Sequence, residues 1–175
     1  MALDGITLSM LKNELSEKLI GARIDKIHQP SKEELVISLR WNGGNGKLLI
    51  SASANGPRIH FTENKYENPP SPPMFCMLLR KYLSSARLIE VLQPALERVV
   101  VLVFSGTNEM GDITEIRLVC ELIGGKANII LVNHDGKIID SLKHSDIETA
   151  SRLILPGATY NFPEKADYAP STDVM

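Results

Sequence analysis

The fold is decided by the stretch from residue 98 to residue 142, which reads RVVVLVFSGTNEMGDITEIRLVCELIGGKANIILVNHDGKIIDSL. Its apolar runs are rich in Val, Ile and Leu, and turn-forming residues interrupt them about every ten residues. Runs of this composition and length predict β-strands, and Asn133-His134-Asp135-Gly136 predicts a tight turn between two of them. We therefore expect strands at 98–104, 113–123, 127–132 and 137–142.

A further group of strands is expected outside this stretch. Residues 34–41 and 47–54 are rich in strand formers and flank the flexible turn Asn42-Gly43-Gly44-Asn45-Gly46, so they predict a hairpin. Residues 58–62 and 88–92 predict two more short strands. Many short strands separated by turns are typical of a mainly antiparallel sheet or sandwich.

Helices are expected at three places. Leucines at every third or fourth position predict a helix over residues 7–19. Residues 73–84 are apolar around much of the helical circumference, so we expect a mostly buried helix with Arg80 and Lys81 alone on its outer face. A short helix at 146–153 is expected to close the fold. The sequence thus predicts an α+β class: a mainly antiparallel β-sandwich with two or three helices.

The overall charge restricts how the chain can bind a polyanion. Among 175 residues the formal net charge is -2, and the isoelectric point is about 6.1. Domains that bind nucleic acid through bulk electrostatics are usually strongly basic, so any RNA contact is expected to be local. No apolar run approaches the roughly 20 residues of a membrane helix, and the sequence starts without a signal peptide, so we expect a cytoplasmic location.

The sequence offers no pattern for a metal, a cofactor or a disulfide. Cys76 and Cys120 lie in apolar stretches and predict two buried thiols. Met74 and Met77 are expected in the core. The segment Gly124-Gly125-Lys126 lacks the Ser or Thr that follows Lys in a phosphate-binding loop, so it predicts a turn between strands. Metal-ligand spacing is also missing among the four histidines, His28, His60, His134 and His144.

A family resemblance rests on the central part of the chain. The segments Pro57–Thr62, Tyr66–Pro69 and Pro72–Leu83 are very similar to the central signature of the NFACT N-terminal domain, which opens the RqcH family. The pair Glu97-Arg98 falls where the family usually has Asp-Arg. The resemblance covers nearly the whole chain from Asp4 to Tyr160, which makes it too extensive for a generic core helix.

The resemblance also implies a domain organisation. We expect the NFACT N-terminal domain at residues 1–160. Residues 161–175 lose the apolar pattern and are rich in Pro, Ala, Asp, Ser and Thr, so we expect a linker there. In the family, a helix-hairpin-helix region, a coiled coil and a second RNA-binding domain follow, and this sequence contains none of them.

The resemblance implies a role in bacterial ribosome quality control. Family members bind the large ribosomal subunit obstructed by peptidyl-tRNA and recruit aminoacyl-tRNA, so that the stalled chain receives a C-terminal alanine tail. The expected partners are therefore tRNA, in particular alanine tRNA, and the large subunit, with no membrane, DNA or cofactor. The ribosome makes the peptide bonds, so we expect no enzyme activity and no catalytic residue. The fold is expected to resemble the N-terminal β-sandwich of formamidopyrimidine-DNA glycosylases.

The resemblance assigns Asp4, Glu97 and Arg98 to tRNA engagement and tailing. The planar guanidinium of Arg98 can fork onto a phosphate or stack on an unpaired base. The two carboxylates can orient that guanidinium, or accept a hydrogen bond from a base amine or a ribose hydroxyl. The simpler alternatives are an exposed ion pair at a strand start for Glu97 and Arg98, and a turn cap for Asp4. Further candidate RNA contacts are Arg80, Lys81 and Lys126.

Two other functions are alternatives. A DNA glycosylase of the similar fold uses an N-terminal proline amine and a neighbouring acid, whereas this sequence has Ala2 and no Glu before Glu14. A surface adhesin that binds fibronectin is suggested by the historical name of the family. No signal peptide, anchor or repeat in the sequence supports the adhesin.

Overall fold

The protein is described from a computed structural model, in which residues 13, 16, 17, 19–94, 98–108, 110–145 and 152–163 are described. Nine strands and one helix have assigned bounds in this part of the chain. The helix is α2 (Met74–Leu83). The strands are β1 (Arg23–Ser31), β2 (Glu34–Trp41), β3 (Gly44–Ser51), β4 (Arg58–Thr62), β5 (Arg87–Leu92), β6 (Val99–Thr107), β7 (Ile113–Glu121), β8 (Asn128–Val132) and β9 (Ile138–Ser141).

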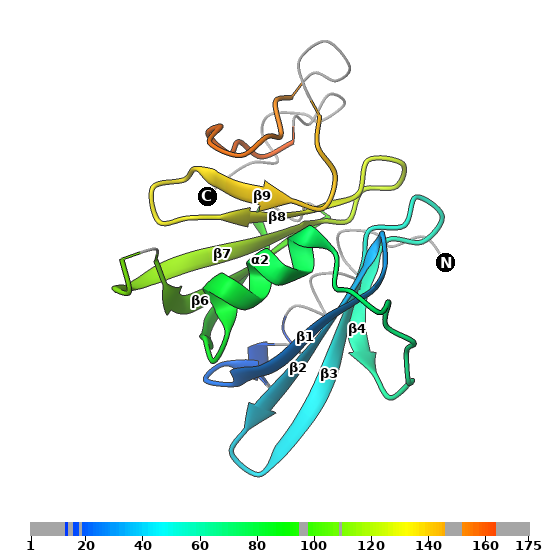
Figure 1. The fold of residues 1–175 in the computed structure, drawn as a ribbon, viewed down its shortest axis with the longest axis vertical. Helices are drawn as coiled ribbons and strands as arrows, with labels where there is room; N and C mark the ends of the chain where they lie inside the picture. The colour runs from blue at the N-terminus through cyan, green and yellow to red at the C-terminus, as the bar shows by residue number, and fades with distance from the viewer. Residues whose placement is uncertain are drawn as a thin grey trace.

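All nine strands belong to one antiparallel sheet, in the order β4-β3-β2-β1-β5-β6-β7-β8-β9 (Figure 1). Most neighbours in the sheet are also neighbours in sequence, so the sheet is built largely from hairpins and meanders. The expected α+β class with a mainly antiparallel sheet is confirmed. The likeness to the formamidopyrimidine-DNA glycosylase domain stays a prediction.

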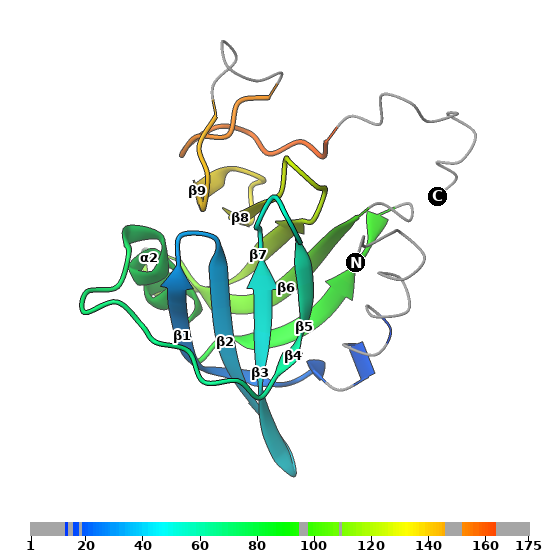
Figure 2. The ribbon, with the colours of Figure 1, turned by 90° about the vertical axis from the view of Figure 1, so that its right-hand side faces the viewer.

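The sheet bends sharply between β1 and β5. These two strands share a single register pair, Arg23 with Arg87. Beyond that pair the two halves of the sheet diverge, and Figure 2 shows the strands of β1–β4 running in a different direction from β5 and β6. The halves enclose a common core between them, to which both contribute buried aliphatic side chains. One folded sheet therefore makes the two layers expected of a sandwich.

Helix α2 fills the space where the two halves separate. It packs on β1, β6 and β9, and its inner side buries Phe75, Cys76 and Leu79 in the common core. Gly106 of β6 allows this close approach, because a β-carbon there would lie 2.8 Å from the backbone oxygen of Tyr82.

A second, smaller core covers the outer face of the β5–β9 half. Val99, Val101 and Val103 of β6 point into it, while the residues between them point into the common core. Residues 152–163 cross this face, and Ile138 and Ala158 bond through their backbones. Because β6 is buried on both faces, its sequence is a nearly unbroken apolar run rather than an alternating one.

Most of the expected strands are confirmed within three residues at each end. The hairpin of β2 and β3 is present, with Trp41 paired to Gly44 across the turn. The turn before β9 is also confirmed, since the Gly136 amide donates to the Asn133 carbonyl at 3.0 Å. Strand β1 was not among the expected strands, because its sequence RIDKIHQPS carries charges and a proline in place of a regular apolar alternation.

Two expected helices fall mainly outside the described residues. Of residues 7–19, only 13, 16, 17 and 19 are described, and they are helical, with Leu19 fully buried. Of residues 146–153, only Arg152 and Leu153 are described, and neither is helical.

The prediction for the two cysteines is confirmed, whereas the prediction for the two methionines of α2 is wrong. Cys76 and Cys120 are buried free thiols, as expected, and burial raises the pKa of both. The expectation that Met74 and Met77 lie in the core is wrong, since they are 75% and 54% exposed. Although α2 is apolar around much of its circumference, it buries one side only, and residues 74, 77 and 81 lie together on its outer side.

Candidate functional site

Arg98 lies at the surface, directly before β6. The residue is half-buried, and its backbone oxygen accepts a hydrogen bond from the Leu122 amide at 2.8 Å. Leu122 leads into the turn that joins β7 to β8, and Lys126 is exposed on that turn, closed by a bond from its amide to the Ile123 carbonyl. The fold therefore brings Arg98 and Lys126 to the same end of the sheet. Asp4 and Glu97, which complete the expected tRNA site, lie outside the described residues.

Arg80 is not on a solvated face of α2, which corrects the sequence-based expectation. Its Nε donates to the Ile27 carbonyl at 2.8 Å, and Nη2 lies 3.3 Å from Nδ1 of His28. The half-buried side chain turns toward β1 because the end of α2 rests on that strand. Lys81 is exposed as expected, with its Nζ 5.4 Å from the centre of the Tyr82 ring.

The expected RNA contacts therefore do not form one cluster. The Tyr82 carbonyl lies against Gly106, near the end of β6. Arg98 precedes the other end of that strand, roughly 25 Å away at 3.3 Å per residue. Arg98 and Lys126 thus lie near the beginning of β6. Arg80 and Lys81 lie near its other end.

A row of three arginines crosses the outer face of the sheet at its bend. Arg23 of β1 is the register partner of both Arg40 of β2 and Arg87 of β5. Directly opposed residues of antiparallel strands project from the same face. All three arginines are exposed, while the residues beside them in sequence point into the common core. We call Arg40, Arg23 and Arg87 the arginine row.

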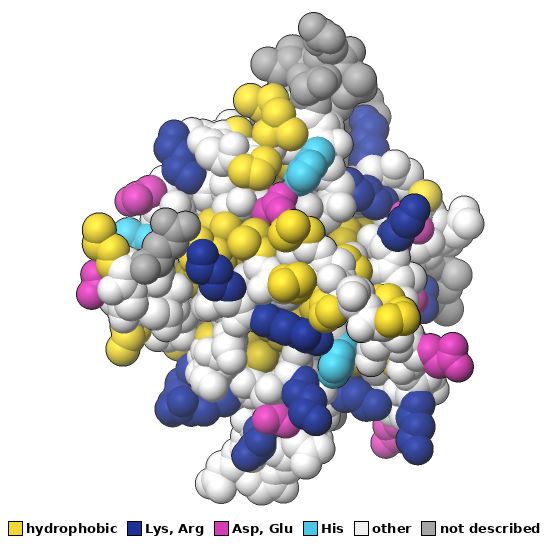
Figure 3. All heavy atoms as spheres, viewed as in Figure 1, with side chains coloured by type: hydrophobic (Ala, Val, Ile, Leu, Met, Phe, Trp, Pro, Cys, Tyr) yellow, Lys and Arg dark blue, Asp and Glu magenta, His cyan; other side chains and the backbone are white. Residues whose placement is uncertain are grey.

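Basic residues continue from the arginine row along β1. Lys26 and His28 follow on the outer face of β1, and Lys47 lies two strands away on β3. Burial lowers the pKa of His28, and the positive charges of Arg80, Lys26 and Lys47 lower it further. In Figure 3, dark blue Lys and Arg side chains lie over the lower half of the molecule, where β1 and β2 lie, with magenta acidic side chains between them.

Three adjoining pockets form a trough beside these residues. The first, of about 360 Å³, is lined by Arg23, Arg40 and Trp41 among others. A second, of about 390 Å³, shares Asp25 with the first and reaches Arg80. A third, of about 170 Å³, shares His28 and Arg80 with the second and ends at Gln29 and Asn68. We call this connected surface the β1 trough.

The part of the chain that the structure describes shows neither a metal centre nor a membrane-spanning helix. Among the described residues, no group of three or more His, Cys, Asp or Glu side chains is placed to hold a metal ion. Within the same residues, no helix is both long enough and apolar enough to cross a membrane. Among the groups that line the trough are the guanidinium groups of Arg23 and Arg40, the ammonium group of Lys26, the imidazole of His28 and the carboxylate of Asp25.

The family is decided by a match along almost the full length of the chain. The family described as NFACT N-terminal and middle domains matches residues 4–174. The chain belongs to this family. The expected resemblance to the NFACT N-terminal domain is thereby confirmed.

Relatives of this NFACT chain include bacterial and human proteins. The Rqc2 homolog RqcH of Bacillus subtilis (strain 168) is 41% identical over 169 residues, which cover 95% of this chain and 30% of that protein. The ribosome quality control complex subunit NEMF of Homo sapiens is 28% identical over 138 residues, which cover 79% of this chain and 12% of that protein. The chain thus spans less than a third of these relatives.

A solved structure shares the fold of this NFACT chain. It is the N-terminal domain of the fibronectin-binding protein PavA from Streptococcus pneumoniae, with a TM-score of 0.89 and 37% identity. The similarity covers 94% of this chain and 63% of that one.

Sequence reasoning on this NFACT chain missed the arginine row and the trough. The three arginines are separated by 17 and 47 positions in sequence, and only the pairing of β2, β1 and β5 brings them together. The signal available in the sequence was an Arg beginning β1, an Arg beginning β5 and an Arg next to last in β2. Without the strand order, these positions have no visible relation.

Proposed function

We propose that this chain is an RNA-binding module of a ribosome quality control factor, which engages tRNA and the large ribosomal subunit in the cytoplasm. The observation that carries the proposal is the family match over residues 4–174, together with relatives that include a ribosome quality control complex subunit. The partial exposure of Arg98, directly before β6, is consistent with it, because a guanidinium that binds a phosphate or a base must be accessible from solvent.

The finer part of the proposal concerns alanine tailing. Arg98, with Asp4 and Glu97, engages an aminoacyl-tRNA, in particular alanine tRNA, and the ribosome then adds alanine to the obstructed chain. Lys126 adds a positive charge at the same end of the sheet as Arg98. Binding and orientation are the whole contribution of this chain, and peptide-bond formation belongs to the ribosome.

The test is an Arg98→Ala substitution in the intact protein. We expect alanine tails on stalled nascent chains to disappear, while the melting temperature stays within about 2 °C because the lost side chain is not in the core. The matched control is Arg117→Ala, which removes an exposed arginine from the middle of β7 and should leave tailing intact. Normal tailing by the Arg98 variant would remove Arg98 from the proposed site.

Fibronectin binding is a second candidate, favoured only by the name of the structurally similar PavA domain. The two candidates are separated by locating the native protein. Co-sedimentation with large ribosomal subunits supports the ribosomal role, and recovery mainly from the cell wall, with saturable binding to immobilised fibronectin, supports the adhesin.

A further inference from the structure

A proline-rich segment covers one end of the β1 trough. Residues 63–73 leave β4 and pass β2 and β1 to reach α2 (Figure 2). The start of this segment is bonded to the sheet, because Lys47 Nζ donates to the Asn64 carbonyl at 3.0 Å. Within the described part of the chain, no hydrogen bond joins residues 67–72 to the strands beside them. These residues, which we call the proline strap, can therefore move away from β1 without breaking a hydrogen bond.

Gln29 of β1 holds an unused hydrogen-bond acceptor beside the proline strap. Gln29 is 5% exposed, and its Oε1 is buried without a hydrogen-bond partner among the described residues. It lines the third pocket of the β1 trough, of about 170 Å³, together with four prolines: Pro69, Pro70, Pro72 and Pro73. Proline has no backbone N–H, so these four residues have nothing to donate to Oε1. A buried acceptor without a donor is costly, and a ligand that brings an N–H or O–H group to it removes that cost.

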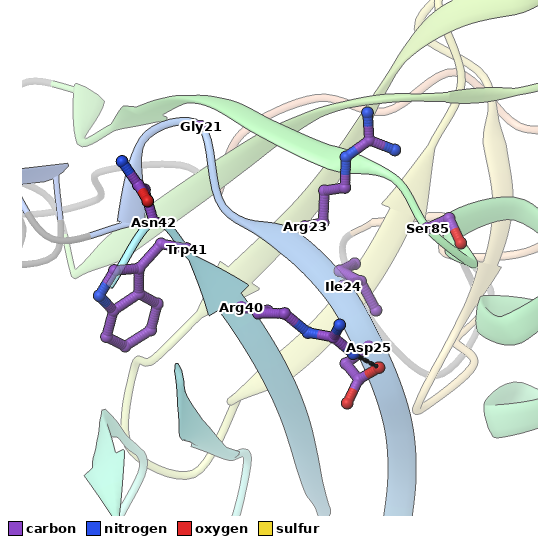
Figure 4. Close-up of a pocket in the computed structure, with 8 residues that line it drawn as sticks. All are labelled: Gly21, Arg23, Ile24, Asp25, Arg40, Trp41, Asn42 and Ser85. Atoms are coloured by element: carbon purple, nitrogen blue, oxygen red, sulfur yellow. Dashed lines mark hydrogen bonds and ion pairs between the residues drawn. The ribbon is translucent and has the colours of Figure 1, made fainter. Parts of the chain in front are cut away.

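The same pocket carries a positive charge. Arg80 lines it, and bonds to the Ile27 carbonyl and to His28 occupy only part of its guanidinium. None of the described residues that line this pocket is Asp or Glu. The carboxylate of Asp25, which lines the other two pockets, is paired with Arg40 at 2.6 Å (Figure 4). The third pocket is therefore suited to an anion.

Size, charge and the missing donor together select the class of ligand. A pocket of about 170 Å³ is smaller than the roughly 300 Å³ that a drug-sized molecule needs, so it takes one residue of a longer ligand. The last residue of a peptide carries a carboxylate for Arg80 and, two bonds away, a backbone N–H for Gln29. A simple anion such as acetate has the charge but brings no donor.

We propose that the third pocket of the β1 trough binds the C-terminal residue of a peptide once the proline strap moves aside. The carboxylate accepts hydrogen bonds from Arg80, the last backbone N–H donates to Gln29 Oε1, and a small side chain packs against the prolines. Guanidinium and carboxylate groups match in geometry as well as in charge. The inference goes beyond the proposed function, because its ligand is a peptide and its site is separate from Arg98.

The test compares three short peptides that carry a fluorophore at the N-terminus and end in Gly-Ala. One has a free C-terminal carboxylate, the second a C-terminal carboxamide, and the third a free carboxylate with an N-methylated last amide. Anisotropy measures the binding of each to the 175-residue chain. We expect the second and third to bind at least about fivefold more weakly than the first, because each lacks one of the two proposed interactions. Equal binding of the three, or no binding of the first, overturns the inference.

Gln29→Met tests the acceptor, because it replaces the amide with an apolar side chain of similar shape. The substitution deletes an unsatisfied acceptor, so the melting temperature should stay the same or rise. The affinity for the free-carboxylate peptide should fall at least about fivefold. N-methylation of the peptide should cost nothing further in this variant, because both changes remove the same hydrogen bond. The matched control is Gln93→Met, at a half-buried glutamine beside a different pocket, and it should leave the affinity unchanged.

Three further outcomes overturn the inference. A melting temperature lowered by Gln29→Met would show that the folded protein already satisfies this acceptor. Additive effects of Gln29→Met and N-methylation would show that the peptide N–H binds elsewhere. Displacement of the peptide by acetate or inorganic phosphate with equal affinity would assign the pocket to simple anions. None of these results bears on the Arg98→Ala test of tailing, because Arg98 lies before β6 and outside this pocket.

Discussion

Arg152 donates two hydrogen bonds to the carboxylate of Glu121, from Nη1 to Oε1 at 2.9 Å and from Nη2 to Oε2 at 2.8 Å. Glu121 is 2% exposed at the end of β7, and the Tyr160 hydroxyl donates to the same carboxylate at 2.6 Å. Burial alone would lower the pKa of Arg152, but the bonds and charge of Glu121 outweigh burial and raise it. This ion pair fastens residues 152–163 to the outer face of the β5–β9 half, where they cover the second core.

Arg152→Ala should lower the free energy of unfolding by about 3 kcal/mol, because it leaves a buried carboxylate without its main partner. Urea unfolding, followed by circular dichroism, measures the loss. The control is Arg117→Ala, whose partner Glu115 is 40% exposed, so the loss there should be at most about 1 kcal/mol. Equal losses in the two variants would contradict a special role for the Glu121 pair.

The stability of the fold should fall in strongly alkaline solution because of Tyr160. Burial and the neighbouring Glu121 raise the pKa of Tyr160 above its usual value. The contribution of Tyr160 is therefore complete below the pKa of about 10 that an unfolded tyrosine has, and is lost as the pH rises above it. Tyr160→Phe should lower stability at neutral pH and flatten the decline above about pH 10. Parallel curves for the two proteins would show that Tyr160 is not the group responsible.

The ion pair of Glu121 with Arg152 also shows how much of the structure could be predicted from the sequence. Glu121 stands out as a carboxylate within the apolar run Val119–Leu122, which indicates a buried partner, but Arg152 lies 31 positions away and no local pattern selects it. The strands of the β5–β9 half could be predicted because the sequence of each strand is by itself an apolar segment rich in strand-forming residues. Strand β1 was not, and without it neither the arginine row nor the trough could be foreseen, since β1 joins the two halves.

Gly106 should be intolerant of any side chain. A β-carbon there would lie 2.8 Å from the Tyr82 carbonyl and 2.9 Å from Cδ1 of Ile116, so α2 would have to move off β6. Gly106→Ala should cost about 1–3 kcal/mol of unfolding free energy, as overpacking does. Gly124→Ala, at a position with no atom within 4 Å of the new β-carbon, is the control, and chemical denaturation compares the two. A Gly106 variant as stable as the control would mean that α2 does not press on β6.

His28 should report the charge of the β1 trough. Its pKa is lowered from 6.5 by burial and by Arg80, Lys26 and Lys47. As the pH falls, His28 is therefore protonated at a higher pH in the unfolded chain than in the folded protein. The contribution of His28 to stability is thus present at neutral pH and declines as the pH falls below 6.5. NMR titration of the His28 imidazole in the folded protein measures this pKa, and a value at or above 6.5 would contradict the combined effect of burial and the three cations.

Crosslinking of the intact protein to large ribosomal subunits that carry peptidyl-tRNA tests the proposed function most directly. Ultraviolet crosslinks, mapped by mass spectrometry on the protein and by primer extension on the RNA, identify both sides of each contact. We expect crosslinked peptides that contain Arg98 or Lys126, joined to tRNA or ribosomal RNA. Crosslinks confined to other parts of the intact protein, with none in residues 1–175, would contradict RNA binding by this chain.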